Sequence, residues 1–109
     1  MKTIFIALLF VTPILASAHT FARYECDILA NDTAWFAKLR DQKIDRAIVL
    51  RDVAKVLREN KSESYITDDE DVDTILAIIN VLYDTPDLTP SAAGDKAKNV
   101  CINELKNSV

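Results

Sequence analysis

Glycine and histidine are almost absent from this chain, with one of each, Gly94 and His19, among 109 residues. Hairpin turns commonly need glycine, so its scarcity argues against a sheet-rich fold. Metal centres and catalytic nucleophiles most often depend on histidine, and the nucleophile-elbow pattern Gly-x-Ser-x-Gly does not occur. We therefore expect no catalytic residue, no metal and no cofactor, and we interpret the chain as something other than an enzyme.

Positive charge is also in short supply. The chain has 13 lysines and arginines against 17 aspartates and glutamates, a formal net charge of −4. Because phosphates repel an acidic protein, nucleic acid is excluded as an expected partner. The apolar runs are shorter than the roughly 20 residues of a membrane span.

The first residues have the order of a secretory signal peptide. Lys2 supplies the positive charge, residues 4–11 are an apolar run, and Ala16-Ser17-Ala18 is a small-residue cleavage triplet. We predict a signal peptide over residues 1–18, cleaved after Ala18, and a single domain over 19–109. The mature protein is expected in the periplasm or outside the cell, with no membrane association after cleavage.

Two cysteines, Cys26 and Cys101, fall in the exported part. Thiols in an oxidising compartment usually pair, which predicts a disulfide between them; two free thiols are the alternative. The chain has no Cys-x-x-C pattern, so redox catalysis is not indicated.

Hydrophobic periodicity predicts an all-α fold, a small bundle of about four helices. The first and last helices would be linked by the disulfide. Thr67 with Glu70 resembles a capping box at the start of the third helix, whose apolar spacing is the most regular in the chain. Thr89-Pro90 predicts a capped start for the fourth, in which Gly94 is expected to cost about 1 kcal/mol of helix stability. The expected helices cover 23–41, 46–59, 67 to the break at 84–87, and 90–106.

The charges are unevenly distributed. Residues 36–61 contain eight basic and four acidic residues, whereas residues 62–109 contain three basic and ten acidic ones. Two interpretations stay open: the two halves complement each other inside the bundle, or an acidic surface meets a basic partner and speeds encounter. The residues proposed for that partner surface are Asp68, Asp69, Glu70, Asp71 and Asp73.

The same acidic run partly matches a calcium-binding loop. Asp69, Asp71 and Asp73 occupy the first three alternating positions of such a loop. The loop needs a glycine where this chain has Thr74 and a glutamate where it has Asn80. Acidic residues in the first turn of a helix are favoured by the helix dipole in any case, so we expect no metal here.

Two stretches resemble a group of small, exported bacterial proteins. One is the Ala-Lys-Leu-Arg-Asp of residues 37–41, which matches an A-x-x-R-D segment. The other is the Val-Leu-Tyr-Asp-Thr-Pro-Asp-Leu-Thr-Pro-Ser-Ala-Ala of residues 81–93, which matches a V-Y-x-x-P-x-L-S/T-P-x-x-A segment except that Leu82 replaces the valine, and a late cysteine follows it. The resemblance implies an all-helical fold with one disulfide and carries no assigned activity. In size and class the chain is also similar to helical immunity proteins of toxin secretion systems and to small acid-activated chaperones.

These observations favour a non-enzymatic, exported interaction protein that binds another protein, in the manner of an immunity or inhibitor protein. An acid-activated holdase is the first alternative, because protonation of many carboxylates can loosen a small fold. A small enzyme of unknown type is the second, and it would require a concave site with perturbed titratable groups.

Overall fold

The computed structural model describes residues 23–60 and 69–107. Within them the chain forms four helices and no strand, as the sequence predicts: α2 (Arg23–Asp41), α3 (Arg46–Glu59), α4 (Asp69–Asp84) and α5 (Pro90–Asn107). The predicted signal peptide, Thr67 and Asp68 lie outside the described residues. The observed bounds of α2 and α3 are those predicted, and α5 ends one residue beyond its predicted end.

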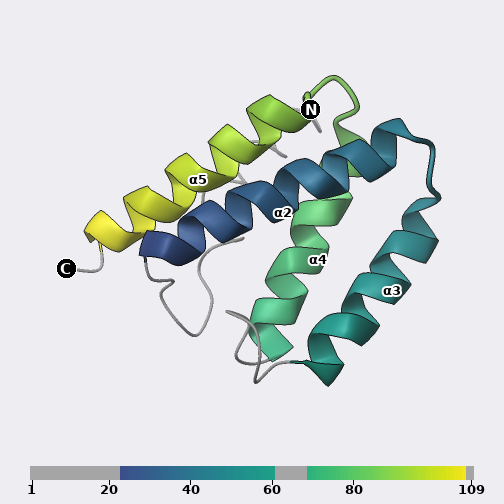
Figure 1. Cartoon of the computed structure of the whole chain (residues 1–109), viewed down its shortest axis with the longest axis horizontal. Helices are drawn as coiled ribbons and strands as arrows, with labels where there is room; N and C mark the ends of the chain where they lie inside the picture. The colour runs from purple at the N-terminus through teal and green to yellow at the C-terminus, as the bar shows by residue number, and fades with distance from the viewer. Residues whose placement is uncertain (1–22, 61–68, 108–109) are drawn as a thin grey trace.

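The helices form two antiparallel pairs that cross each other. Figure 1 shows α2 and α5 side by side in opposite directions, with α4 passing behind α2 and α3 running alongside α4. Since α4 packs against both α2 and α3, it is buried on more than one side, as its unusually apolar sequence predicts. Its buried residues are Asp71, Val72, Thr74, Ile75, Ile78, Ile79, Val81 and Leu82.

The helix ends follow the local sequence in part. At α5, the backbone N–H of Ala92 donates to Thr89 Oγ1 (3.2 Å), which confirms the predicted cap. Asp45 is the N-cap residue of α3, but its side chain makes no capping hydrogen bond. At the end of α2, Lys43 adopts a left-handed conformation (φ 66°). There the N–H of Ile44 donates to the Leu39 carbonyl (3.1 Å), the turn that glycine usually makes.

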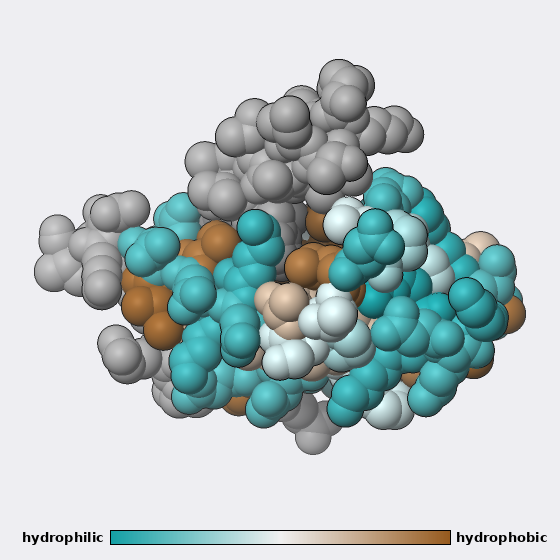
Figure 2. All heavy atoms as spheres, turned by 90° about the horizontal axis from the view of Figure 1, so that it is seen from above, coloured by the Kyte–Doolittle hydropathy of each residue, from teal (hydrophilic) through white to brown (hydrophobic). Residues whose placement is uncertain are grey.

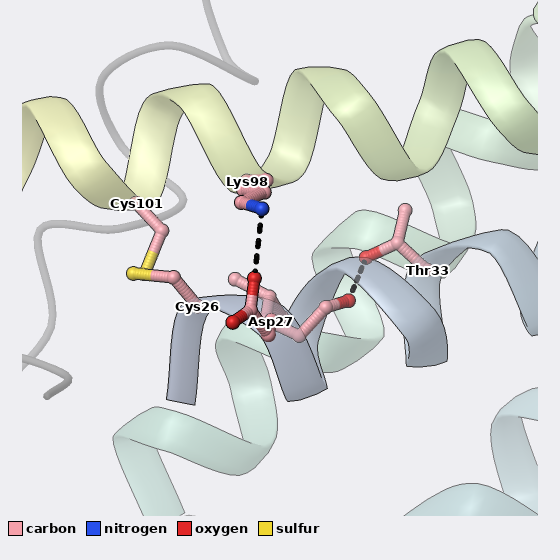
Figure 3. The surroundings of a disulfide bond; sticks show 6 residues. Cys26, Asp27, Thr33, Lys98 and Cys101 are labelled. Carbon is pink, nitrogen blue, oxygen red and sulfur yellow. Dashed lines mark hydrogen bonds and ion pairs between the residues drawn. A yellow bond between two sulfur atoms is a disulfide. The ribbon is translucent and has the colours of Figure 1, made fainter. Parts of the chain in front are cut away.

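The pair α2–α5 is closed by the predicted disulfide. Cys26 and Cys101 are bonded, with their Cα atoms 5.6 Å apart, and both side chains are buried. Figure 3 shows the bond joining the two helices beside an ion pair between Lys98 Nζ and Asp27 Oδ1 (2.9 Å). Both charged side chains are about half exposed, so this pair adds little stability. The disulfide is the covalent link between the two helices.

Small residues let α2 and α5 approach closely. Ala37, Ala93 and Ala97 are buried, and Gly94 lies directly against α2. A Cβ atom added at Gly94 would sit 3.0 Å from the Ala30 carbonyl oxygen and 3.5 Å from the Ala34 Cβ. The expectation that Gly94 simply weakens its helix is therefore incomplete, because the missing side chain is what admits the backbone of α2.

Replacing Gly94 with valine should lower the free energy of unfolding by about 2–4 kcal/mol, since the added atoms would force apart two backbones that already touch. Ala92→Val is the control for the added bulk, because Ala92 is exposed on the same helix. Helix propensity alone would cost this control a few tenths of a kcal/mol and would slightly favour valine over glycine at position 94. Chemical denaturation of both variants measures the difference. Unchanged or increased stability of Gly94→Val would show that the close approach has no energetic consequence.

The side chain of Arg40 links the C-terminal end of α2 to the C-terminal end of α4 by hydrogen bonds. Its guanidinium donates to the carbonyl oxygens of Leu82 (3.0 Å), Thr85 (3.0 Å) and Leu88 (2.6 Å). It also pairs with Asp41 at 2.9 Å, and its side chain is 6% exposed. The last carbonyls of a helix have no partner within it, so Arg40 caps α4 and shapes the turn that leads to α5.

Candidate functional site

A groove between α2 and α3 is the candidate functional site. It has a volume of about 260 Å³. Phe36 forms its buried floor, while Val56, on the opposite wall, is 54% exposed. The described residues that line it are Asp32 and Phe36 of α2 and Asp52, Val53, Val56 and Leu57 of α3.

The groove follows from how α3 is held. The positions that α3 gives to the groove recur at spacings of three and four and so share one face of the helix. The principal packing of α3 is on α4 rather than on α2. Because α3 packs mainly on α4, the face of α3 toward α2 is only partly covered. Apolar side chains on that face remain accessible.

Other exposed apolar side chains lie on the same helical stripes as residues of the groove. Trp35, the chain's one tryptophan, is 55% exposed and Ile28 is 39% exposed; both are on the α2 stripe that contains Asp32. On α3, Ile48 is 43% exposed and precedes Asp52 by one helical turn. Figure 2 shows a mainly hydrophilic surface interrupted by hydrophobic patches. Large exposed apolar side chains beside a groove are typical of surfaces that bind other proteins.

Both charged side chains among the described lining residues are acidic. Asp32 on α2 is half-buried and Asp52 on α3 is exposed, so the groove has one carboxylate from each wall. Asp52 pairs with its neighbour Arg51 at 3.1 Å, with side chains 60% and 72% exposed, and such an exposed pair is weak and easily exchanged. Because α3 also has the exposed basic residues Arg51 and Lys55, the groove is framed by charges of both signs.

The acidic residues proposed as a partner surface do not form one continuous surface. Asp69 and Glu70 are exposed at the start of α4, but Asp71 is completely buried. Asp73 is exposed and pairs with Arg58 of α3 at 3.8 Å. Asp68 lies outside the described residues, so the accessible part of this group consists of Asp69, Glu70 and Asp73.

Part of the uneven charge is paired within the molecule, through ion pairs between α3 and α4. Near the other end of the same helix pair, Arg46 of α3 pairs with Asp84 of α4 at 2.7 Å and lies 5.4 Å from the centroid of the Tyr83 ring. The Tyr83 hydroxyl donates to the Ile44 carbonyl (2.6 Å), and burial, followed by the nearby Asp45 charge, raises the pKa of Tyr83 above its ordinary value of 10.0. The basic helix α3 and the acidic helix α4 thus complement each other, in line with the first of the two interpretations of the charge pattern.

Sequence reasoning missed the groove and the role of Arg40. The sequence did contain a signal for the role of Arg40. Arg40 falls on the stripe of α2 that carries the buried residues Leu29, Thr33 and Phe36, and a buried guanidinium needs hydrogen-bond partners. The segments 37–41 and 81–93 meet here, because Arg40 from the first binds carbonyls of the second.

The described residues contain no group of three or more histidine, cysteine, aspartate or glutamate side chains arranged to hold a metal ion. Among the helices of residues 23–60 and 69–107, none has the length and apolar character needed to cross a membrane. Compared with protein-family models, curated proteins and solved structures, the chain matches none of them.

Proposed function

We propose that the protein is a non-enzymatic, exported binding protein that holds another protein in the groove between α2 and α3, as an immunity or inhibitor protein would. The carrying observation is the groove itself, in which Val56 of α3 stays accessible opposite the buried Phe36 of α2, while Trp35, next to Phe36 in the chain, is exposed. A disulfide between helices is in keeping with an oxidising compartment, and the predicted signal peptide would deliver the chain there.

The geometry supports binding in a specific way. A partner that covers the groove removes Trp35 and Val56 from water, and exposed aromatic residues at the centre of an interface commonly contribute about 2 kcal/mol or more. The disulfide and the close α2–α5 contact hold α2 in place before any partner arrives. Since a rigid surface loses little conformational entropy on binding, more of the contact energy is available as affinity.

The test is to place a photo-crosslinking amino acid at position 35, in cells that export the protein, and to identify the attached protein by mass spectrometry. Position 91 is the control, because Ser91 is exposed on α5, a helix that does not line the groove. We expect a specific partner from position 35 and none from position 91. Crosslinks that are the same from both positions, or absent from both, would refute the proposal.

The identified partner is then titrated against purified variants. Val56→Asp places a charge in the groove and should weaken binding at least tenfold, which corresponds to about 1.4 kcal/mol. Ala92→Asp, at an exposed position of α5, should leave affinity unchanged. Far-ultraviolet circular dichroism checks that both variants keep their helices. A partner that binds Val56→Asp as tightly as the wild type does not use the groove.

A further inference from the structure

We infer that α3 is a detachable segment of the fold: it leaves α4 and unfolds as a unit while α2, α4 and α5 stay folded. The opening widens the groove between α2 and α3. It is a property of the protein alone, so its test does not depend on the proposed function. Three observations support it: the shallow burial of α3, the polar character of the side of α4 that faces it, and the uneven strength of its attachment.

The first observation is burial. Two side chains of α3 are buried, Val49 and Ala54, whereas α4 has eight buried residues. On α3, Ile48 is 43% exposed and Val56 is 54% exposed, and the groove separates part of this helix from α2. Because buried apolar surface is what opposes the detachment of a segment, α3 is held less firmly than α4.

The second observation is the side of α4 that faces α3. Ion pairs and a hydrogen bond join α3 to Asp73, Asn80 and Asp84 of α4, and spacings of seven and four positions put these three residues on one stripe. Ile75 and Leu82, which are almost completely buried, lie on the far side of α4 by the helical repeat of about 3.6 residues. The main apolar side of α4 can therefore stay packed when α3 leaves.

The third observation is that the two ends of α3 are attached unequally. Near its start, Arg46 pairs with Asp84 at 2.7 Å. Near its end, Arg58 lies 3.8 Å from Asp73, and both side chains are more than half exposed, so this second pair is weak. Detachment should therefore begin at the C-terminal end of α3.

The opening has a consequence for the groove. A helix of 14 residues is marginal without packing partners, so α3 loses its internal hydrogen bonds once it has left α4. Its departure uncovers Phe36, the buried floor of the groove, together with the side of α4 that α3 had covered. This surface is accessible only in the open state, and a partner that binds it shifts the population toward that state.

The experiment is native-state hydrogen exchange of the oxidised protein, followed residue by residue by NMR at urea concentrations below the unfolding transition. Amides in the middle of α3, residues 50–57, should exchange at least about tenfold faster than those in the middle of α2 and α5. Their exchange rates should rise with urea, but less steeply than the rates set by global unfolding, because detachment exposes the surface of one helix and not of the whole domain.

Two matched variants distinguish detachment from global unfolding. Ala54→Gly and Ala97→Gly make the same change at buried positions in the middle of α3 and of α5. Ala54→Gly should speed exchange in α3 about fivefold. Ala97→Gly should speed the slowest amides of α2 and α5 and leave α3 unchanged, because α5 stays folded in the open state.

Three results would overturn the inference. They are α3 amides that exchange no faster than those of α5, α3 amides that respond equally to the two variants, and α3 exchange rates that do not change with urea, which would indicate fraying of single turns. The crosslink from position 35 judges the proposed function separately, whichever way the exchange experiment turns out.

Discussion

Replacing Arg40 with methionine is expected to lower the free energy of unfolding by about 3–5 kcal/mol, the largest loss we foresee for any single substitution. Methionine keeps most of the apolar stem but removes every donor. The carbonyls of Leu82, Thr85 and Leu88 then lose their charged partner, and hydrogen bonds to charged groups are worth about 1.5–3 kcal/mol each. A domain of about 90 residues has roughly 5–13 kcal/mol of stability in total, so the variant should be near its unfolding threshold.

Urea denaturation with the disulfide intact measures this loss. Lys38→Met is the matched control, since Lys38 is exposed on the same helix and should change stability by less than about 0.5 kcal/mol. Arg40→Lys should recover only part of the loss, because an ammonium is a compact point charge and cannot span three separated carbonyls as a guanidinium does. A loss below about 1 kcal/mol for Arg40→Met would mean that water replaces the guanidinium at little cost.

Removing the disulfide has the second largest expected effect. The bonded cysteines are 75 positions apart, and chain-entropy arithmetic for a loop of that length gives about 4 kcal/mol of stabilisation. The double variant Cys26→Ala/Cys101→Ala should therefore unfold at a much lower denaturant concentration. Both sulfur atoms are buried in the α2–α5 interface, so alanine also removes apolar contacts there and adds to the loss.

Two experiments test the contribution of the covalent bond apart from that of the buried sulfur atoms. Reduced wild-type protein keeps the sulfur atoms but loses the bond, and it should fall between the oxidised protein and the double variant. Alkylation of the folded, unreduced protein should modify no thiol. An unchanged unfolding midpoint after reduction, or rapid alkylation without reduction, would contradict the expected role of the bond.

Much of the fold is encoded locally and could be predicted for that reason. The bounds of α2 and α3 follow from apolar periodicity and the polar segments between them. The start of α5 follows from Thr89 and Pro90, because a capping hydroxyl and a proline in the first turn each act within a few residues. The pairing of Cys26 with Cys101 is non-local, but it was predictable because the chain contains only those two cysteines.

The features that escaped prediction depend on how the helices cross. The burial of Asp71 depends on which turn of α4 faces its neighbours. The groove exists because α3 packs on α4 at a distance from α2, and no residue of either helix encodes that gap by itself. From the sequence alone, Gly94 is only an unfavourable helix residue. Its role in packing becomes clear from the position of the Ala30 backbone beside it.

The pairing of α2 with α5 has a consequence for the order of folding. The neighbours α3 and α4 contact each other across a short stretch of sequence and can associate early, and α2 can then pack on α4. The principal contact of α2, which is with α5, must wait until α5 has been synthesised. Until then Cys26 is a thiol without its natural partner, and it can attack the disulfide of another molecule to form a mixed disulfide, with release of that molecule's other thiol. Closure of the ring between the two ends of the domain should therefore be the slow, final step of maturation, and oxidation after the chain has been released should give more native protein than oxidation during its synthesis.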